Sequence, residues 1–346
     1  EMMIVNSPDI QESIFRVIVP EQTIVEYKDG VKKEKIKTIS GEELMKLDIP
    51  PMKYIVSSLI PQGMHVVSGP SKIGKSWLLL LLCLKVAKGE RFWNLRTEKG
   101  TVLYLCLEDG LRRIQDRLSE FTEEAPDNLY FATSAPSLAE DLASQIENFI
   151  TEHPDTVMIV IDTLQKIREG CGEANAYADD YKDIGNLKSI ADKNNIALMV
   201  VHHVRKQWSD DPHQMVIGTT GIIGAADTSY VLMKEKITDD VAKFYVRGRD
   251  VEEQVLTIKF NPESKEWVFV SSNSPIADAM KNDKVISLLI NFIKKQTDFI
   301  GTASELANTL GGETKANVLT RRLSRYKNEL ADMGIEDSVV ENGWLA

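Results

Sequence analysis

Residues 65–82 read HVVSGPSKIGKSWLLLLL, and this stretch decides the fold class of the chain. A short valine-rich run leads into Gly69–Ser76, which fits the pattern G-x-x-x-x-G-K-S/T, and a leucine-rich run follows it. A strand, a glycine-bearing loop and a helix in this order are typical of a P-loop, where backbone N–H groups and the helix N-terminus attract phosphate. An accidental turn is the alternative, and the flanking strand and helix make it the weaker interpretation.

The loop itself would supply most of the contacts to a nucleotide. Lys75 is expected to reach the β- and γ-phosphates of ATP, and the Ser76 hydroxyl is expected to hold Mg²⁺. We expect nine consecutive residues to surround the phosphates: Gly69, Pro70, Ser71, Lys72, Ile73, Gly74, Lys75, Ser76 and Trp77. ATP and Mg²⁺ are therefore the predicted cofactors.

Three polar residues end other apolar runs and would complete such a site. TVMIVIDT contains Asp162 at its end, a costly place for a carboxylate unless it holds Mg²⁺ beside Ser76; capping the next helix is the alternative. TVLYLCLE ends at Glu108, which would orient or deprotonate the attacking water if its strand adjoins the P-loop strand. A solvated acid before the following helix is the alternative. IALMVVHH ends at His203, which we interpret as a γ-phosphate sensor rather than a half-buried structural histidine.

The composition fits a globular chain with one large core and a smaller one. The chain has 346 residues, 43% of them hydrophobic. A net charge of -11 weighs against a protein that coats duplex DNA by bulk charge, but leaves open a local basic groove or a channel built from several subunits. The leucine-rich run at 77–87 is too short to span a bilayer, and no signal peptide opens the chain. With three cysteines and no C-x-x-C pair, these features predict a cytoplasmic protein.

The middle of the chain, residues 61–272, alternates apolar β-branched runs with amphipathic stretches. Strands that are apolar throughout are buried on both faces, and their alternation with helices predicts an α/β domain with a mostly parallel central sheet. Residues 243–270 alternate more strictly and predict an antiparallel hairpin or meander at the edge of that sheet.

Two smaller parts flank this domain. Residues 1–60 are expected to form a leader with a hairpin around Asp29-Gly30 and a short helix capped by Ser40. Residues 276–346 predict three helices and a terminal hairpin around Asn342-Gly343, the elements of a winged-helix-like domain.

The motifs GPSKIGKS, YLCLED, VIDT, VVHHVRK and VIGTTGIIGAADTSYVL, in this order, resemble RecA-like P-loop ATPases related to the RepA hexameric helicase of mobile plasmids. The likeness covers residues 40–260. It implies a RecA-like core whose subunits form a ring, with ATP between subunits and single-stranded DNA in the channel. The family's residues for hydrolysis and sensing match five positions: Lys75, Ser76, Glu108, Asp162 and His203.

The arginine that such rings insert into the neighbouring site matches less well. RepA-like helicases carry it just before the segment that reads GTTG here, where this chain has Ile217. Arg247 and Arg249 resemble instead the paired basic residues that DnaB-type helicases send into the neighbour's site, where arginine neutralises charge on the transferred phosphoryl group. Plain surface charge is the alternative for this pair.

Two segments, residues 168–180 and 205–221, follow the Asp162 and His203 strands, where RecA-like proteins place DNA-binding loops. Four of their side chains could pair with phosphates or stack on bases: Arg168, Arg205, Lys206 and Trp208. Both segments also carry many acids, so only a ring or filament would concentrate the basic positions.

The C-terminal part gathers positive charge on one predicted helix. Its basic residues are Lys315, Arg321, Arg322, Arg325 and Lys327. As a recognition helix it could meet duplex DNA, while a solvated face or a surface for a replication protein is the alternative.

Together these expectations describe a Mg²⁺- and ATP-dependent ring ATPase acting on single-stranded DNA, a replicative helicase of a plasmid, phage or integrative element. A RecA/RadA-like recombination or repair ATPase and a non-motor, ATP-dependent DNA-associated regulator remain as alternatives.

Overall fold

A computed structural model gives the fold. The structure describes residues 2–5, 26–28, 31–33, 38–44, 46–47, 52–168, 176–205, 209–216, 220–236, 238–273, 280, 282–295, 298–312, 314–326, 330 and 333–339. Contacts divide the chain into Ser7–Met52 and the remainder, Glu1–Asn6 with Lys53–Ala346, and the parts are described separately below. Within the described residues, no helix combines the length and the apolar character needed to cross a membrane.

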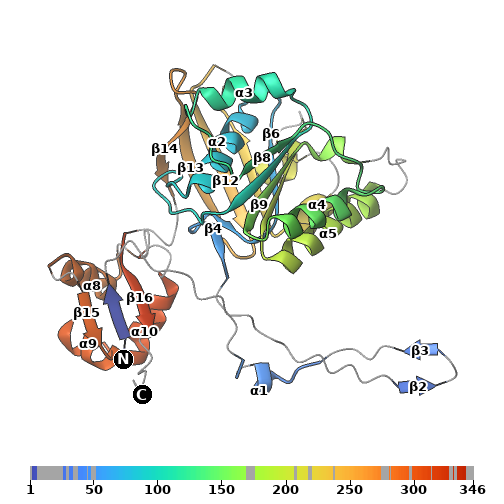
Figure 1. Cartoon of the computed structure of the whole chain (residues 1–346). Coiled ribbons are helices and arrows are strands. Elements are labelled where there is room, and N and C mark those ends of the chain that lie inside the picture. Colours follow the sequence, from blue (N-terminus) through green and yellow to red (C-terminus); the bar gives the residue numbers. More distant parts are fainter. Residues whose placement is uncertain are drawn as a thin grey trace. The chain divides into compact units, whose positions relative to one another are not determined.

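Within the described residues, nine strands form a central sheet, which is mostly parallel as the sequence predicts (Figure 1). Its parallel strands are β6 (Gly63–Gly69), β7 (Thr101–Cys106), β8 (Leu129–Ala132), β9 (Thr156–Asp162), β10 (Ala197–His203) and β11 (Thr228–Met233). The predicted antiparallel meander is also present, as β12 (Val241–Gly248), β13 (Gln254–Phe260) and β14 (Trp267–Ser272). The order across the sheet is β14-β13-β12-β11-β6-β10-β9-β7-β8.

Helices cover both faces of this sheet (Figure 1). One face packs against α2 (Lys75–Lys88) and α3 (Leu111–Ser119), together with the small hairpin of β4 (Tyr54–Val56) and β5 (Ile60–Pro61). The other face packs against α4 (Leu142–Glu152), α5 (Ala176–Asn194) and α6 (Thr220–Ala225). Two apolar cores result, one on each side, which is why the strands are apolar along their whole length.

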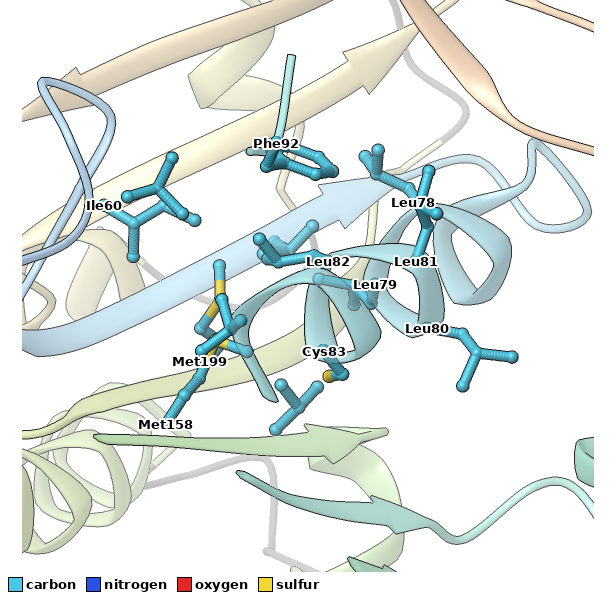
Figure 2. Packing of buried hydrophobic residues seen from close by; sticks show 14 of the residues in the cluster. Ile60, Leu78, Leu79, Leu80, Leu81, Leu82, Cys83, Phe92, Met158 and Met199 are labelled. Atoms are coloured by element: carbon cyan, nitrogen blue, oxygen red, sulfur yellow. The ribbon is translucent and has the colours of Figure 1, made fainter. Parts of the chain in front are cut away.

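The leucine-rich helix α2 is buried around its whole circumference. Every residue from Leu78 to Leu84 is at most 5% exposed. Figure 2 shows leucines leaving the helix in several directions, with Met158 and Met199 of the sheet and Phe92 of a neighbouring segment close to it. A helix that is apolar on all sides lies within a core, so the P-loop that precedes α2 has a rigid base.

The sheet order corrects one expectation. The strand that ends before Glu108 does not adjoin the P-loop strand, because β10 and β9 lie between β6 and β7. β7 pairs instead with β9, with Cys106 opposite Asp162. The carboxyl ends of parallel strands meet at one edge of a sheet, so Glu108 still reaches the edge that carries the P-loop.

The C-terminal part contains the three predicted helices, α8 (Lys284–Lys295), α9 (Ala303–Thr309) and α10 (Ala316–Arg325). Its antiparallel sheet has the order β15-β1-β16, from β15 (Asp298–Gly301), β1 (Met2–Val5) and β16 (Glu336–Val339). The first residues of the chain thus supply the middle strand. The turn predicted at Asn342-Gly343 lies outside the described residues.

The segment Ser7–Met52 contains a short hairpin and a short helix. β2 (Glu26–Lys28) pairs antiparallel with β3 (Val31–Lys33), as predicted, while Asp29-Gly30 lies outside the described residues. The helix is α1 (Gly41–Leu44), and the Ser40 hydroxyl accepts a hydrogen bond from the Glu43 amide at 3.1 Å. The predicted cap is therefore confirmed.

Candidate nucleotide-binding site

The P-loop joins the end of β6 at Gly69 to the start of α2 at Lys75, and its two glycines are required by their surroundings. A Cβ on Gly69 would lie 2.6 Å from the Leu232 carbonyl oxygen of β11. Gly74 has a φ of +106°, and a Cβ there would lie 3.0 Å from Nε1 of Trp267. The glycine pattern read from the sequence thus reflects crowding by β11 and β14, as well as the backbone turn.

Lys75 folds its side chain back over the loop. Its Nζ donates hydrogen bonds to the carbonyl oxygens of Gly69 at 2.8 Å and Pro70 at 3.0 Å. Burial lowers the pKa of Lys75, and the nearby carboxylates of Asp162 and Glu108 oppose this effect. The ammonium group therefore lies inside the loop, where the phosphates of a nucleotide would provide its counter-charge. Of the other predicted loop contacts, Ser71 and Lys72 are exposed, Ile73 is buried, and Pro70 and Trp77 are half-buried.

Asp162 and Ser76 meet in the structure as the sequence predicts. The Ser76 Oγ donates to Oδ2 of Asp162 at 2.7 Å, and the Tyr104 hydroxyl donates to the same oxygen at 3.1 Å. Asp162 is 6% exposed, and burial raises its pKa while the two hydrogen bonds oppose the shift. Carboxylate and hydroxyl oxygens are the hard ligands that Mg²⁺ prefers, so this pair fits a magnesium ion bound together with nucleotide phosphates.

Tyr104 is a site residue that the sequence interpretation missed. It lies two residues before the end of β7, and it is 2% exposed. Burial and the neighbouring Asp162 raise the pKa of its phenol, which keeps the hydroxyl protonated as a donor. The signal was a tyrosine within the buried run TVLYLC, since a buried phenol needs a hydrogen-bond partner.

Glu108 is exposed and lies beside the end of β9, where Asp162 and Thr163 are. Its Oε1 accepts a hydrogen bond from the Thr163 hydroxyl at 3.2 Å, and the Leu107 amide donates to the Asp162 carbonyl at 2.8 Å. The two strand ends are thereby fixed to each other. The charge of the Glu108 carboxylate, like that of Asp162, raises the pKa of Lys75 and so opposes the effect of burial.

His203 lies opposite Gly69 in the pairing of β10 with β6. Side chains alternate along a strand, so His203 shares its face with Met199 and Val201, which belong to the core beneath α2. Its Nδ1 is buried, and within the described residues no hydrogen-bond partner satisfies it. The imidazole therefore lies next to the P-loop with a free polar atom.

Arg247 and Arg249 lie at the other edge of the sheet, where β12 ends opposite the beginning of β11. Arg247 donates hydrogen bonds to Asp211 at 2.8 Å and to Glu253 at 2.5 Å. The Arg249 side chain is 62% exposed and donates to the Gly224 carbonyl at 3.3 Å. Neither arginine therefore reaches the P-loop of its own chain, and Arg249 is the less constrained of the two.

The two predicted DNA-binding segments are described only in part. Arg168 pairs with Asp180 and with Asp183, and its side chain is only 11% exposed, so its charge is compensated within the subunit. Arg205 is exposed and donates to the Gln214 carbonyl at 2.6 Å. The remaining predicted positions lie outside the described residues: Lys206, Trp208 and Ile217.

A family model described as AAA domain matches residues 31–209, more than half of the chain. The chain belongs to the AAA domain family. Two solved structures resemble this AAA domain protein at 13% sequence identity and a TM-score of 0.51. One is described as an ATPase domain and is matched over 61% of this chain and 85% of its own length. The other is a DnaB-like replicative helicase, solved with regard to its interactions with primase, and is matched over 66% of each chain. No curated protein matches the sequence.

At this level of identity the likeness establishes the fold. The AAA domain chain has a RecA-like P-loop NTPase core of the kind found in DnaB-like helicases, as predicted. The residues at its P-loop edge fit ATP and Mg²⁺: a buried lysine, a paired serine and aspartate, a second carboxylate and a histidine with a free ring nitrogen.

Proposed function

We propose that this AAA domain chain is a Mg²⁺-dependent ATPase of RepA type that assembles into a ring, a hexamer, around single-stranded DNA and unwinds duplexes during replication of a plasmid, phage or integrative element. The observation that carries the proposal is the meeting of Lys75, Ser76, Asp162 and Glu108 at one sheet edge. The fold supports it, because the solved structures that share it include a replicative helicase.

Each residue has a distinct role in this proposal. Ser76 and Asp162 would hold Mg²⁺, which neutralises charge on the β- and γ-phosphates. The Lys75 ammonium group would donate its hydrogen bonds to phosphate oxygens in place of the two loop carbonyl oxygens. Glu108 would accept a proton from the attacking water. His203 donates a hydrogen bond to the γ-phosphate and thereby distinguishes ATP from ADP.

Arg249 completes the site of the neighbouring subunit. It lies at the sheet edge remote from its own P-loop and is exposed, so only another copy's nucleotide can be its partner in hydrolysis. Arg247 is held by two carboxylates and supports the hairpin from which Arg249 projects. An arginine in trans stabilises charge on the transferred phosphoryl group and is worth about 10³–10⁵ in rate.

The proposal is tested by mixing two inactive variants. Arg249→Ala and Glu108→Gln are each expected to lose DNA-stimulated ATP hydrolysis, and an equimolar mixture is expected to regain part of it. Mixed rings contain sites that combine an intact Glu108 with a neighbour's intact Arg249. Phosphate release is measured with and without single-stranded DNA, and mass in solution is measured with a non-hydrolysable ATP analogue.

Other outcomes would select another function. No regained activity, or a monomeric mass with the analogue and DNA present, contradicts the shared site. Filaments that pair homologous strands would indicate a recombination ATPase. ATP binding without DNA stimulation or unwinding of forked DNA would indicate a non-motor regulator.

The C-terminal part offers a surface for duplex DNA. A cavity of about 690 Å³ lies where α8 and α10 begin, and its lining includes Lys284, Lys315 and Arg322. Arg322 pairs with Asp283 at 2.8 Å, whereas Lys284 and Lys315 are exposed and form no ion pair within the described residues. Such free cations can neutralise backbone phosphates in a protein that is acidic overall.

Charge reversal tests this surface. The double variant Lys284→Glu/Lys315→Glu is expected to bind duplex DNA at least about ten-fold more weakly, with hydrolysis at the P-loop retained. Lys294→Glu/Lys295→Glu is the matched control, since it makes the same charge change at the other end of α8. Affinity is measured by fluorescence anisotropy at two salt concentrations. Equal loss in both variants would mean that bulk charge alone attracts DNA, and no loss would assign the surface to a protein partner.

A further inference from the structure

The first residue of β14, Trp267, reaches the P-loop from the antiparallel meander. Its Nε1 donates a hydrogen bond to the carbonyl oxygen of Gly74 at 3.2 Å, across 193 positions of sequence. Trp267 is 1% exposed, and its hydrogen bond to the half-buried Gly74 is partly buried. The close approach also explains why Gly74 has no room for a side chain.

The carbonyl that accepts this bond belongs to the peptide that joins Gly74 to Lys75. The same oxygen accepts the first hydrogen bond of α2, from the Leu78 amide at 3.1 Å. Because this carbonyl points along the helix, the Lys75 N–H on the other side of the peptide points out of the helix N-terminus, where phosphate binds. Two donors on one oxygen fix the orientation of the peptide and polarise its N–H group.

The indole is itself held firmly in place. Trp93 donates from its Nε1 to the Trp267 carbonyl oxygen at 2.6 Å, and the Phe260 ring meets the indole edge-on with centroids 5.3 Å apart. The Lys234 ammonium lies 5.5 Å from the centroid of the ring. A side chain restrained on several sides can aim its single donor at one acceptor with little freedom.

We infer that Trp267 is a positioning residue for nucleotide binding: its indole N–H holds the Gly74–Lys75 peptide so that the Lys75 amide is presented to the β-phosphate. The inference rests on the proposed binding of nucleotide at the P-loop. It assigns to the meander a part in the chain's own nucleotide site, in addition to the arginine that the meander carries at its other edge. Nucleoside diphosphates and triphosphates benefit equally from this arrangement, whereas AMP, which has no β-phosphate, gains nothing.

Trp267→Phe tests the inference, because it keeps an aromatic ring in the core and removes the donor. We expect ADP to bind about five-fold more weakly, the ratio that corresponds to one neutral hydrogen bond, and AMP to bind as it does to the wild type. Tyr230→Phe is the matched control, since it also removes one donor from a buried aromatic side chain, whose hydrogen bond goes to the Leu59 carbonyl oxygen and not to the P-loop or Trp267. Dissociation constants are measured by calorimetry on the full chain, and melting temperatures show that each variant is folded.

The possible results separate the inference from the proposed function. If the wild type does not bind ADP, the proposed function fails. If the wild type binds ADP and Trp267→Phe binds it equally well, the inference is overturned. An equal loss for AMP, or an equal loss in Tyr230→Phe, would mean that Trp267 acts only through packing and would also overturn the inference. Should Trp267→Phe not fold, benzothienylalanine at position 267 keeps the shape of the indole with sulfur in place of N–H, and the same expectations apply.

Discussion

Lys75→Ala is expected to lower ATP hydrolysis by at least about 10³-fold and to weaken nucleotide binding. Lys75 is the buried cation of the P-loop, 7% exposed, and its ammonium already lies within hydrogen-bond distance of two loop carbonyls. Alanine leaves the phosphates without this charge in a site where little water can replace it. Phosphate release at saturating ATP and calorimetric titration with ADP measure the two effects.

A lysine at the far end of the same helix provides the control for this variant. Lys88 ends α2 and donates to the Thr122 hydroxyl at 2.8 Å, so Lys88→Ala removes the same charge at a distance from the loop. It is expected to leave hydrolysis unchanged. Near-normal hydrolysis in Lys75→Ala would remove the basis for every function proposed for this chain, because all of them depend on the P-loop.

The polar residues at the P-loop edge of the sheet could be located from the sequence because a local pattern marks each of them. Asp162, Glu108 and His203 each end an apolar run, and parallel strands bring such ends to one edge whatever their order. The order itself could not be predicted. The insertion of β10 and β9 between β6 and β7 depends on how the helices pack across the sheet, and no local pattern records it.

Contacts between segments that lie far apart in the sequence could not be predicted either. Tyr104 and Trp267 lie in strands and resemble ordinary core residues until the neighbours of those strands are known. The positive charge of Arg168 suggested a DNA contact, but Asp180 and Asp183 on the following helix compensate it. Hydrophobic patterning shows which face of an element is buried and leaves its polar partners undetermined.

Glu108→Gln is expected to reduce hydrolysis by about 10²–10⁴-fold while ATP binding is retained. The glutamine carbonyl can still accept the hydrogen bond from the Thr163 hydroxyl, so the geometry at the end of β7 is preserved. The glutamine cannot accept a proton from the attacking water. The variant is therefore expected to bind ATP and to retain it without hydrolysis. Single-turnover hydrolysis and the ATP content of the isolated complex measure both properties.

A variant of the neighbouring Asp109 shows whether hydrolysis depends on the negative charge of this strand end or on proton transfer to Glu108. Asp109 pairs with Arg113 and Arg117, so Asp109→Asn also removes one negative charge at this strand end but takes it from an ion pair on α3. It is expected to hydrolyse ATP at the wild-type rate. Equal losses in the two variants would mean that the overall charge of this edge governs hydrolysis. Retained hydrolysis in Glu108→Gln would instead require another base, such as the Asp162 carboxylate, at the cost of its hydrogen bond with Ser76.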